Sequence, residues 1–378
     1  MARITRFLGT LLGVGLVTFV FGEIGARVIG IRPLSEAADV YEAHPRWGWH
    51  YRPGSSGEFV KLGARQQVEI GSRGLREREI PYERTPGVAR VLVLGDSAVV
   101  GMEVAPEEVF PRVAERSLQE RGRAVEFINA GCRGWGTDQS LLFLEDEGVR
   151  YRPDLVLYFW NPNDVEDNQT VHRPYRMYGK SYFDLAPDGS LVLKGAPVPE
   201  YPATRYVRVG SDGNEVELDV TPVVQAQMWL RDNVVMKTAF GTALAHLVAA
   251  VPQLTAAVVG RSTFDAGNVG IDTVDRESRL FRVTVAMVRE MARIAEQNGA
   301  QFQLLGTPDP WLDAVRAEAG LAPFGDMQEF VARMKQFYTE HPGGEKFLVP
   351  FDTHWNAFGH RVYGEVLADR IEAANLLP

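Results

Sequence analysis

The sequence predicts an α/β domain built on a parallel, doubly wound sheet and preceded by an apolar N-terminal helix. Short runs of Val, Leu and Phe lack polar alternation, which is typical of strands buried on both faces of a parallel sheet. Helix-period segments separate these runs, as strand–helix alternation requires. Glycine and polar residues stand where the runs end, and open α/β sheets bind their ligands at that edge.

Length and composition indicate a large globular protein and exclude several structural and functional classes. The 378 residues suggest two domains or one large domain with an insertion, and a hydrophobic share of 45% is enough for a sizeable core. A single cysteine permits no internal disulfide and excludes Cys-rich zinc modules. The net charge of −9 disfavours nucleic acid as a partner, because neutralising phosphates needs a positive surface.

Residues 1–32 have the pattern of a membrane-targeting segment. Arg3 and Arg6 precede the uncharged run FLGTLLGVGLVTFVFG, whose 16 residues would span roughly 24 Å as a helix. Apolar residues resume at 28–31, and no small-residue cleavage site followed by a polar start is visible. We therefore favour an uncleaved signal-anchor over a cleaved signal peptide. Either interpretation places most of the chain outside the cytoplasm.

The elements of the predicted domain, residues 89–378, follow in chain order. The strand candidates are RVLVL at 90–94, VEFIN at 125–129, LVLYFW at 155–160 and QFQLL at 301–305. Helices are expected after Pro106, where acidic residues occupy the first turn, over 275–298 and over 356–374.

Two segments lie outside this alternation. Residues 33–88 are punctuated by Pro and Gly and are expected to wrap the domain as irregular structure. Residues 165–272 are expected to form an insertion over the carboxyl edge of the sheet. Within it, 181–195 predicts a β-hairpin around Asp188-Gly189, and 221–251 predicts helix.

Residues able to perform acyl chemistry follow the predicted strands. Ser97 comes directly after the first strand, in Gly-Asp-Ser, where a nucleophile would be exposed at the sheet edge. The second strand leads into a glycine-rich loop containing Gly134, and the third into NPND with Asn163. Asp352 and His354 precede the last helix, two residues apart. Together these residues offer a nucleophile, a base, an orienting acid and donors for an oxyanion.

These motifs resemble the SGNH/GDSL hydrolase superfamily over roughly residues 67–375. VLVLGDS, INAGCRGWGTDQ, FWNPND and DTHWNAFGH occur in the order of the four family blocks. GSRGLRERE, VEDN and the apolar N-terminus further resemble a membrane-anchored bacterial branch. The resemblance implies a three-layer α/β/α sandwich with a parallel, flavodoxin-like sheet.

The resemblance also implies the roles of the site residues. Ser97 would be the nucleophile, His354 the base and Asp352 its partner, while Gly134 (or Gly131) and Asn163 would donate to the oxyanion. No cofactor or metal is expected. The sequence departs from the family pattern in two places. Asn161 replaces a glycine of the third block, and the last block reads D-x-H rather than D-x-x-H.

The apolar stretch 239–259 is not expected to be a second membrane span. Ser97 precedes it and His354 follows it, so one crossing would separate nucleophile and base. It is expected to be a core helix or an interfacial lid.

Several other residues near the blocks have simpler expected roles. Cys132 is expected to be a buried thiol and His360 a packing or capping residue, while Asp96 and Asp164 should fix loops through hydrogen bonds. Tryptophans at 47, 49, 135 and 160 are expected mainly to pack in the core, and Trp135, next to Gly134, is the candidate among them for contact with ligand.

Three functions are consistent with this sequence. The first is an extracytoplasmic serine esterase that cleaves O-acyl esters of a small molecule or glycan. The second is an O-acetyltransferase acting on a cell-surface polysaccharide, since the same residues serve both reactions. The third is a non-catalytic glycan- or lipid-binding protein on the same fold. The joint presence of Ser97, Asn163 and His354 argues against the third, because a binding protein needs no aligned triad.

Overall fold

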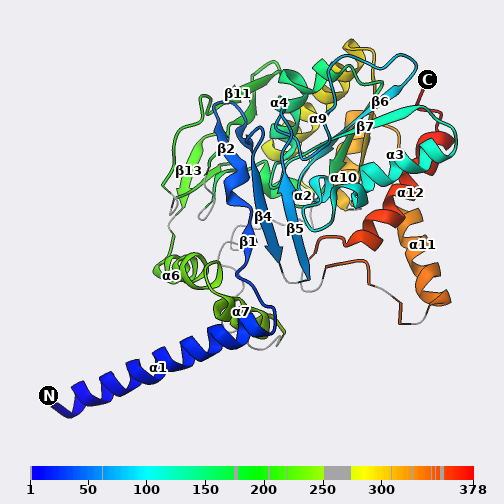
Figure 1. The fold of residues 1–378 in the computed structure, drawn as a ribbon. Coiled ribbons are helices and arrows are strands. Elements are labelled where there is room, and N and C mark those ends of the chain that lie inside the picture. The colour runs from blue at the N-terminus through cyan, green and yellow to red at the C-terminus, as the bar shows by residue number, and fades with distance from the viewer. Residues whose placement is uncertain are drawn as a thin grey trace.

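A parallel sheet of four strands organises the chain in the computed structural model, in the order β14-β8-β6-β7 (Figure 1). The structure describes residues 2–378 except 62, 174–177, 203–204, 219, 251–273, 308, 325–326, 342, 345 and 350–352. The four predicted strands are confirmed as β6 (Ala89–Gly95), β7 (Val125–Gly131), β8 (Leu155–Trp160) and β14 (Gln301–Gly306).

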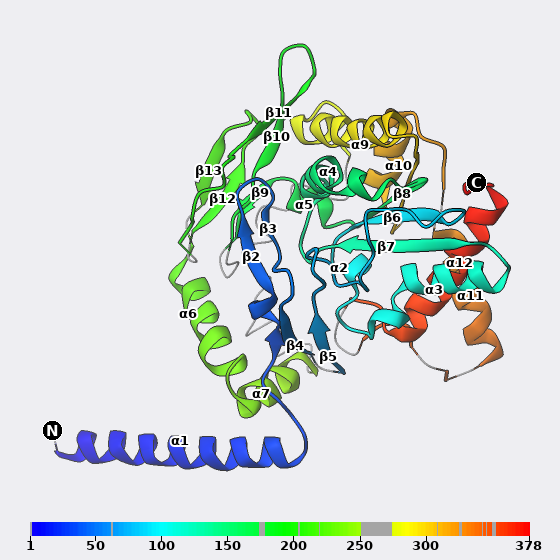
Figure 2. The same ribbon diagram turned by 45° about the horizontal axis from the view of Figure 1, so that its top comes forward.

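Helices cover both faces of this sheet, which confirms the predicted α/β fold (Figure 2). Successive side chains of each strand point to opposite faces, so Leu92 and Leu94 enter one core while Val91 and Val93 enter the other. The first face carries α4 (Thr137–Asp146), α9 (Arg279–Gln297) and α10 (Pro310–Ala319). The second carries α3 (Phe110–Glu120), α11 (Met327–Glu340) and α12 (Ala357–Ala373).

The parallel register brings the carboxyl ends of the strands to one edge. Gly95 pairs with Gly131, and Gly306 pairs with Trp160. Two short helices follow these ends, α2 (Ser97–Val100) after β6 and α5 (Asp164–Asp167) after β8. The 3₁₀ turn η2 (Pro106–Glu108) precedes α3, and the 3₁₀ turn η3 (Gly148–Tyr151) lies between α4 and β8. The loops that hold the predicted site residues therefore meet at this edge.

Residues 33–88 differ from the expected irregular structure, because they contain five short strands. A hairpin of β2 (Tyr41–His44) and β3 (Gly48–Tyr51) lies beside a sheet ordered β1-β4-β5. That sheet consists of β1 (Ser35–Glu36), β4 (Ser56–Lys61) and β5 (Ala64–Glu69), and η1 (Ala38–Val40) precedes β2. Strands of two to six residues are too short to show a periodicity between the Pro and Gly turns.

The described part of the insertion forms small sheets and two helices. The predicted hairpin is present as β10 (Tyr182–Leu185) and β11 (Leu191–Lys194). β12 (Tyr206–Val209) pairs with β9 (Thr170–His172) and with β13 (Glu215–Leu218). The predicted helix at 221–251 is divided into α6 (Pro222–Leu230), a π-helical turn η4 (Arg231–Val235) and α7 (Ala239–Ala250). Residues 251–259 of the second apolar stretch lie outside the described residues.

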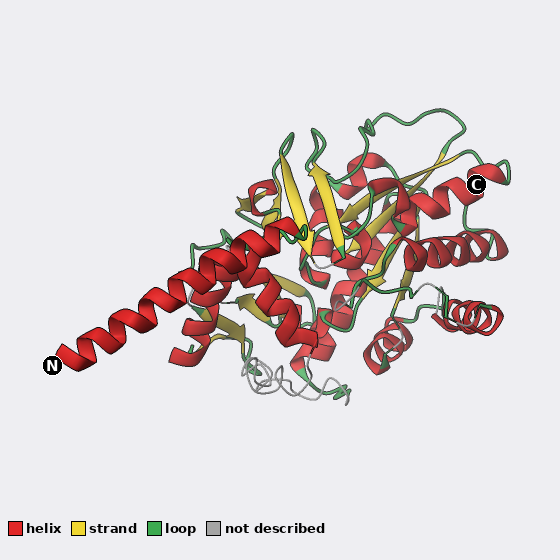
Figure 3. Cartoon of the chain, turned by 60° about the horizontal axis from the view of Figure 1, so that its bottom comes forward, coloured by secondary structure: helices red, strands yellow, loops and turns green. Residues whose placement is uncertain are grey.

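Helix α1 (Ala2–Val28) projects from the body of the molecule with its N-terminus at the far end (Figure 3). Within it, Gly9–Val28 has a mean hydropathy of 1.7 and is only 6% buried, so its length and composition are sufficient for a membrane span. α7 packs against α1, with the Phe19 and Phe240 rings edge to face. The backbone N–H of Phe240 donates to Glu23 Oε2 at 2.8 Å.

Candidate active site

Ser97 is held at the sheet edge by a tight turn after β6. Gly95 has φ 149°, and a Cβ there would lie 2.6 Å from Val99 Cγ2 and 3.0 Å from the Phe159 carbonyl oxygen. Only glycine fits that turn. Asp96 then caps α2, because its Oδ1 accepts the Ala98 N–H at 3.0 Å.

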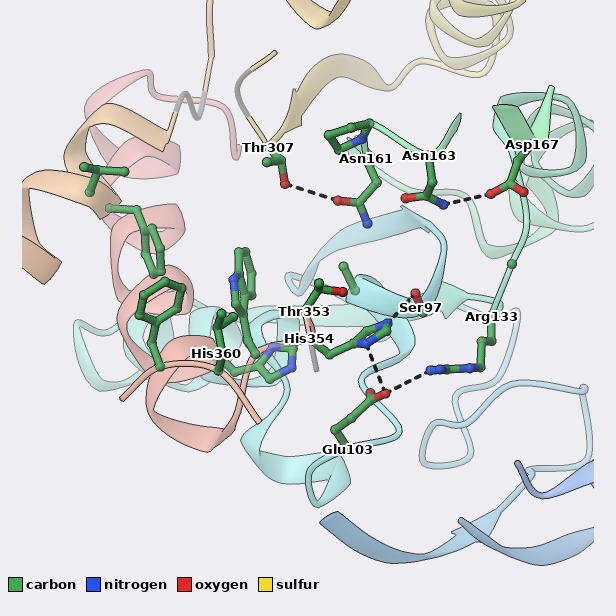
Figure 4. A pocket seen from close by; sticks show the side chains of 18 of the residues that line it. Ser97, Glu103, Arg133, Asn161, Asn163, Asp167, Thr307, Thr353, His354 and His360 are labelled. Atoms are coloured by element: carbon green, nitrogen blue, oxygen red, sulfur yellow. Dashed lines mark hydrogen bonds and ion pairs between the residues drawn. The ribbon is translucent and has the colours of Figure 1, made fainter. Parts of the chain in front are cut away.

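His354 approaches Ser97 from the turn before α12. Its Nε2 lies 2.8 Å from Ser97 Oγ, so the predicted nucleophile and base form a hydrogen bond across 257 residues of sequence (Figure 4). The backbone around it is fixed, since Val349 N–H donates to the His354 carbonyl at 2.9 Å. Next to it, the Trp355 ring packs against Phe330. Asp352, the predicted partner of His354, lies outside the described residues.

A second carboxylate, which the sequence analysis did not single out, faces the other nitrogen of His354. Glu103 Oε1 lies 3.5 Å from His354 Nδ1, and the Glu103 side chain is 1% exposed. Arg133 Nη1 donates to the same oxygen at 2.9 Å (Figure 4). Burial, the largest single effect, would lower the pKa of Arg133, but the charges of Glu103, Tyr41 and Glu36 and the hydrogen bond to Glu103 together outweigh it and raise the pKa. A lone Glu six residues after a serine has no sequence pattern that would mark it.

Of the two glycines considered for the oxyanion, Gly134 is the one that lines the cavity. Its φ of 77° is in the region that favours glycine. The N–H of Gly131 instead donates to Asn129 Oδ1 at 3.0 Å, within the buried end of β7. This geometry favours Gly134 over Gly131.

Asn163 faces the same cavity, but both hydrogens of its amide have acceptors. Its Nδ2 donates to Asp167 Oδ2 at 2.8 Å and to Asp96 Oδ2 at 3.1 Å. Asn161 donates to the other oxygen of Asp96 at 2.8 Å and accepts from Thr307 at 3.1 Å. An oxyanion would receive a hydrogen bond from Asn163 only after replacing one of these carboxylates.

Asp96 and Asp164 fix loops through hydrogen bonds, as predicted. Asp164 Oδ2 accepts the Tyr158 hydroxyl at 2.9 Å and the Asn161 N–H at 3.0 Å. Burial, reinforced by the charges of Asp96 and Asp167, raises the pKa of Asp164 well above its ordinary value. The carboxyl group therefore serves to hold the loop that carries the two asparagines.

Ser97 and His354 open into a cavity of about 750 Å³. One group of lining side chains is apolar: Phe330, Val331, Phe347, Leu348 and Trp355. Another is polar: Arg133, Asn161, Asn163, Asp167, Arg173 and Thr307. Such a cavity can hold a substrate with an apolar part and a polar part next to the serine.

Other expectations have mixed outcomes. Cys132 is buried, as predicted. His360 is also buried, its Nδ1 accepts the Phe110 N–H at 3.3 Å, and burial lowers its pKa to about 3.

The expected contact of Trp135 with ligand is wrong. The Trp135 side chain is 2% exposed, and its indole N–H donates to the Trp49 carbonyl at 3.0 Å, because β3 covers the ring. No described residue of α6 or α7 lines the cavity, so the described part of this segment does not form a lid.

Metal ligands do not gather in the described part of the chain, where no group of three or more His, Cys, Asp or Glu side chains is arranged to hold an ion.

No family model and no curated protein matches the chain. Solved structures that resemble it include TesA, with 13% identity over 75% of this chain and 98% of that one and a TM-score of 0.35. The esterase EstA from Pseudoalteromonas sp. has 10% identity over 76% and 98%, with a TM-score of 0.37. A lipase/acylhydrolase from Enterococcus faecalis has 14% identity over 77% and 97%, with a TM-score of 0.34.

Proposed function

We propose that this chain is a serine ester hydrolase of the SGNH/GDSL type, acting through an acyl-enzyme on Ser97. The observation that carries the proposal is the 2.8 Å hydrogen bond between Ser97 Oγ and His354 Nε2 at the wall of the cavity. A hydroxyl paired with an imidazole beside a substrate-sized cavity is the arrangement of an activated nucleophile. A protein that only binds a glycan or lipid has no need for it.

In the proposed reaction, Ser97 Oγ attacks the carbonyl carbon of the ester while its proton passes to His354 Nε2. The carbonyl electron pair moves to oxygen and forms a tetrahedral oxyanion. Collapse of this intermediate breaks the bond to the alcohol, which takes the proton from His354. Water then repeats the sequence on the acyl-enzyme, which releases the acid and restores Ser97.

The backbone amides of Ser97 and Gly134 and the side chain of Asn163 are the proposed oxyanion donors. Gly134 and Asn163 line the cavity that holds Ser97, which supports this assignment. Asp352 is the proposed acid that orients His354, on the basis of the resemblance of the last block to the family pattern. Small-molecule or glycan O-acyl esters are the proposed substrates. The cavity has apolar lining side chains for the acyl part of such a molecule and polar lining side chains for its alcohol or sugar part.

We further propose that α1 anchors the protein in a membrane, with the catalytic domain on the extracytoplasmic side. The apolar span Gly9–Val28 is exposed, and Arg3 and Arg6 precede it. Arginines on the N-terminal flank favour retention of that flank in the cytoplasm. The chain after α1 would then lie in the periplasm or at the cell surface.

The test is hydrolysis of nitrophenyl acetate by the full chain in detergent, beside Ser97→Ala and His354→Ala. We expect turnover that both substitutions reduce by about 10³-fold or more. Ser190→Ala and His341→Ala, at exposed positions away from the cavity, are matched controls and should keep wild-type rates. Turnover that is unchanged in Ser97→Ala would contradict the proposal. If folded wild-type protein turns over no simple ester but acetylates a polysaccharide, the acetyltransferase alternative replaces hydrolysis.

A further inference from the structure

Glu103 occupies the position from which a carboxylate would orient the catalytic imidazole. For His354 Nε2 to accept the Ser97 hydroxyl proton across their 2.8 Å contact, as the proposed function requires, the neutral ring must carry its hydrogen on Nδ1. That hydrogen is on the side of the ring where Glu103 Oε1 lies, 3.5 Å from Nδ1 (Figure 4). We propose that Glu103 is a positioning residue that acts on His354 in addition to the proposed partner Asp352: it favours the tautomer with the hydrogen on Nδ1 and stabilises the protonated ring. This inference rests on the proposed function.

The loop that carries Glu103 is held rigidly on both sides. Arg76 is 3% exposed, and its Nη1 donates to the carbonyls of Val100 at 3.1 Å and Gly101 at 2.7 Å. Its Nη2 donates to the Val104 carbonyl at 2.8 Å. A single guanidinium therefore fixes the backbone immediately before and after Glu103.

The carboxylate itself is placed by two cations. Besides Arg133 at 2.9 Å, Lys61 Nζ lies 3.6 Å from Oε1. The Arg133 guanidinium carbon lies 5.2 Å from the centre of the Phe59 ring, and Phe59 and Lys61 are both in β4. The N-terminal sheet thus supports the catalytic histidine indirectly, through the ion pairs of Glu103.

Two features indicate that this carboxylate acts on His354 in addition to its ion pairs with Arg133 and Lys61. Its second oxygen, Oε2, has no hydrogen-bond partner within the described part of the chain. The Nδ1–Oε1 distance is an ion-pair distance that exceeds a hydrogen bond by about 0.5 Å, and such contacts tighten when the imidazole becomes charged.

The decisive variant is Glu103→Gln, and its control is Glu107→Gln, at an exposed position of η2 four residues further along the chain. We expect kcat to fall by at least about tenfold with little change in KM, because the step that protonates His354 is impaired. The acidic limb of the kcat/KM profile should move to lower pH, since the charge that favours the imidazolium is gone. Circular dichroism and thermal unfolding of each variant show whether it is folded, and rates are compared only between folded chains.

A double-mutant cycle with His354→Ala distinguishes positioning from general damage. If Glu103 acts through His354, Glu103→Gln should cost nothing further in the His354→Ala background. A full additional loss there, or a wild-type rate and pH profile in Glu103→Gln, would overturn the proposal. Should Glu103→Gln fail to fold, Glu103→Asp keeps a charge near Arg133 but is one methylene shorter, and a wild-type kcat and pH profile in that variant would also overturn it.

An NMR spectrum of the ¹⁵N-labelled His354 ring reports which ring nitrogen carries the hydrogen and needs no turnover, so it separates this inference from the proposed function. Hydrogen on Nδ1 in the parent chain and a mixture of the two tautomers in Glu103→Gln support the positioning role even if no ester is hydrolysed. The same tautomer in both chains refutes it, even in a chain that is an active esterase.

Discussion

The amide of Asn163 faces both the cavity beside Ser97 and two carboxylates, and its proposed contribution to catalysis can be measured directly. Asn163→Ala removes the proposed side-chain donor to the oxyanion, and loss of one such donor typically costs about 10²–10³ in rate. We expect a loss of that size in kcat for nitrophenyl acetate. Thr307→Val removes only the hydrogen bond to Asn161 and should cost less than about tenfold. Equal turnover by Asn163→Ala and the wild type would remove Asn163 from the mechanism.

Glu77 should make the stability of the fold depend on pH. Its side chain is 5% exposed, and its oxygens accept the N–H groups of Arg78 at 2.8 Å and Asn129 at 3.2 Å. Burial outweighs these contacts and raises the pKa from 4.5 to about 7. Between those values the unfolded chain releases a proton that the folded chain retains. The free energy of unfolding therefore falls as pH rises, by at most about 3 kcal/mol for this group.

The comparison with Glu77→Gln isolates this effect. Denaturant unfolding of both chains from pH 4.5 to 8 should show the wild type losing stability relative to Glu77→Gln until about pH 7, and a constant difference above it. Parallel curves across the whole range would mean that Glu77 ionises at its ordinary pH in the folded protein.

Some residues of the candidate site could be predicted from the sequence and others could not. Ser97 and His354 were predictable, because each stands at the end of an element with a strong pattern and their chemistry requires a partner. Glu103 was not predictable from the sequence, since its place beside His354 depends on ion pairs with Lys61 of β4 and with Arg133, which are distant in the sequence. The burial of Trp135 likewise depends on β3, which the sequence did not predict.

At the scale of elements, the packing of α12 on α3 depends on Gly364. A Cβ at this position would lie 2.5 Å from Val113 Cβ and 2.8 Å from the Phe110 carbonyl oxygen. Gly364→Ala should therefore lower the free energy of unfolding by about 1–3 kcal/mol, despite the better helix propensity of alanine. Glu365→Ala, at the exposed neighbouring position, should stay within about 0.5 kcal/mol of the wild type. Equal stability of the two variants would contradict this account of the helix contact.

The elements that could be predicted from the sequence share one property: their apolar residues recur with the period of a strand or a helix, or form a continuous run, over the whole element. The four buried strands and α9 repeat their apolar residues over enough positions to be distinguished from loops. The strands β1 to β5 are too short for that, and their pairing depends on contacts far along the chain. The segment 221–251 kept its predicted helical character but is divided by the π-helical turn at Arg231–Val235, which no local pattern marked.

At the scale of the whole molecule, α1 should determine where the protein resides. Its apolar span is exposed apart from the contact with α7 near Phe19, as the proposed membrane anchor requires. We expect the full chain to stay with membranes through an alkaline carbonate wash, and a chain lacking residues 2–30 to enter the soluble fraction. Release of the full-length chain by the wash would contradict a membrane-spanning α1.

The most direct test of the catalytic account is mass spectrometry of the intact protein during turnover of a nitrophenyl acetate. The account predicts one acetyl group per chain before the steady state, located on the peptide that contains Ser97. It also predicts that Ser97→Ala and His354→Ala do not accumulate this adduct. An acetyl group on another residue, or equal labelling of Ser97 in the absence of His354, would contradict a mechanism in which these two side chains act as nucleophile and base.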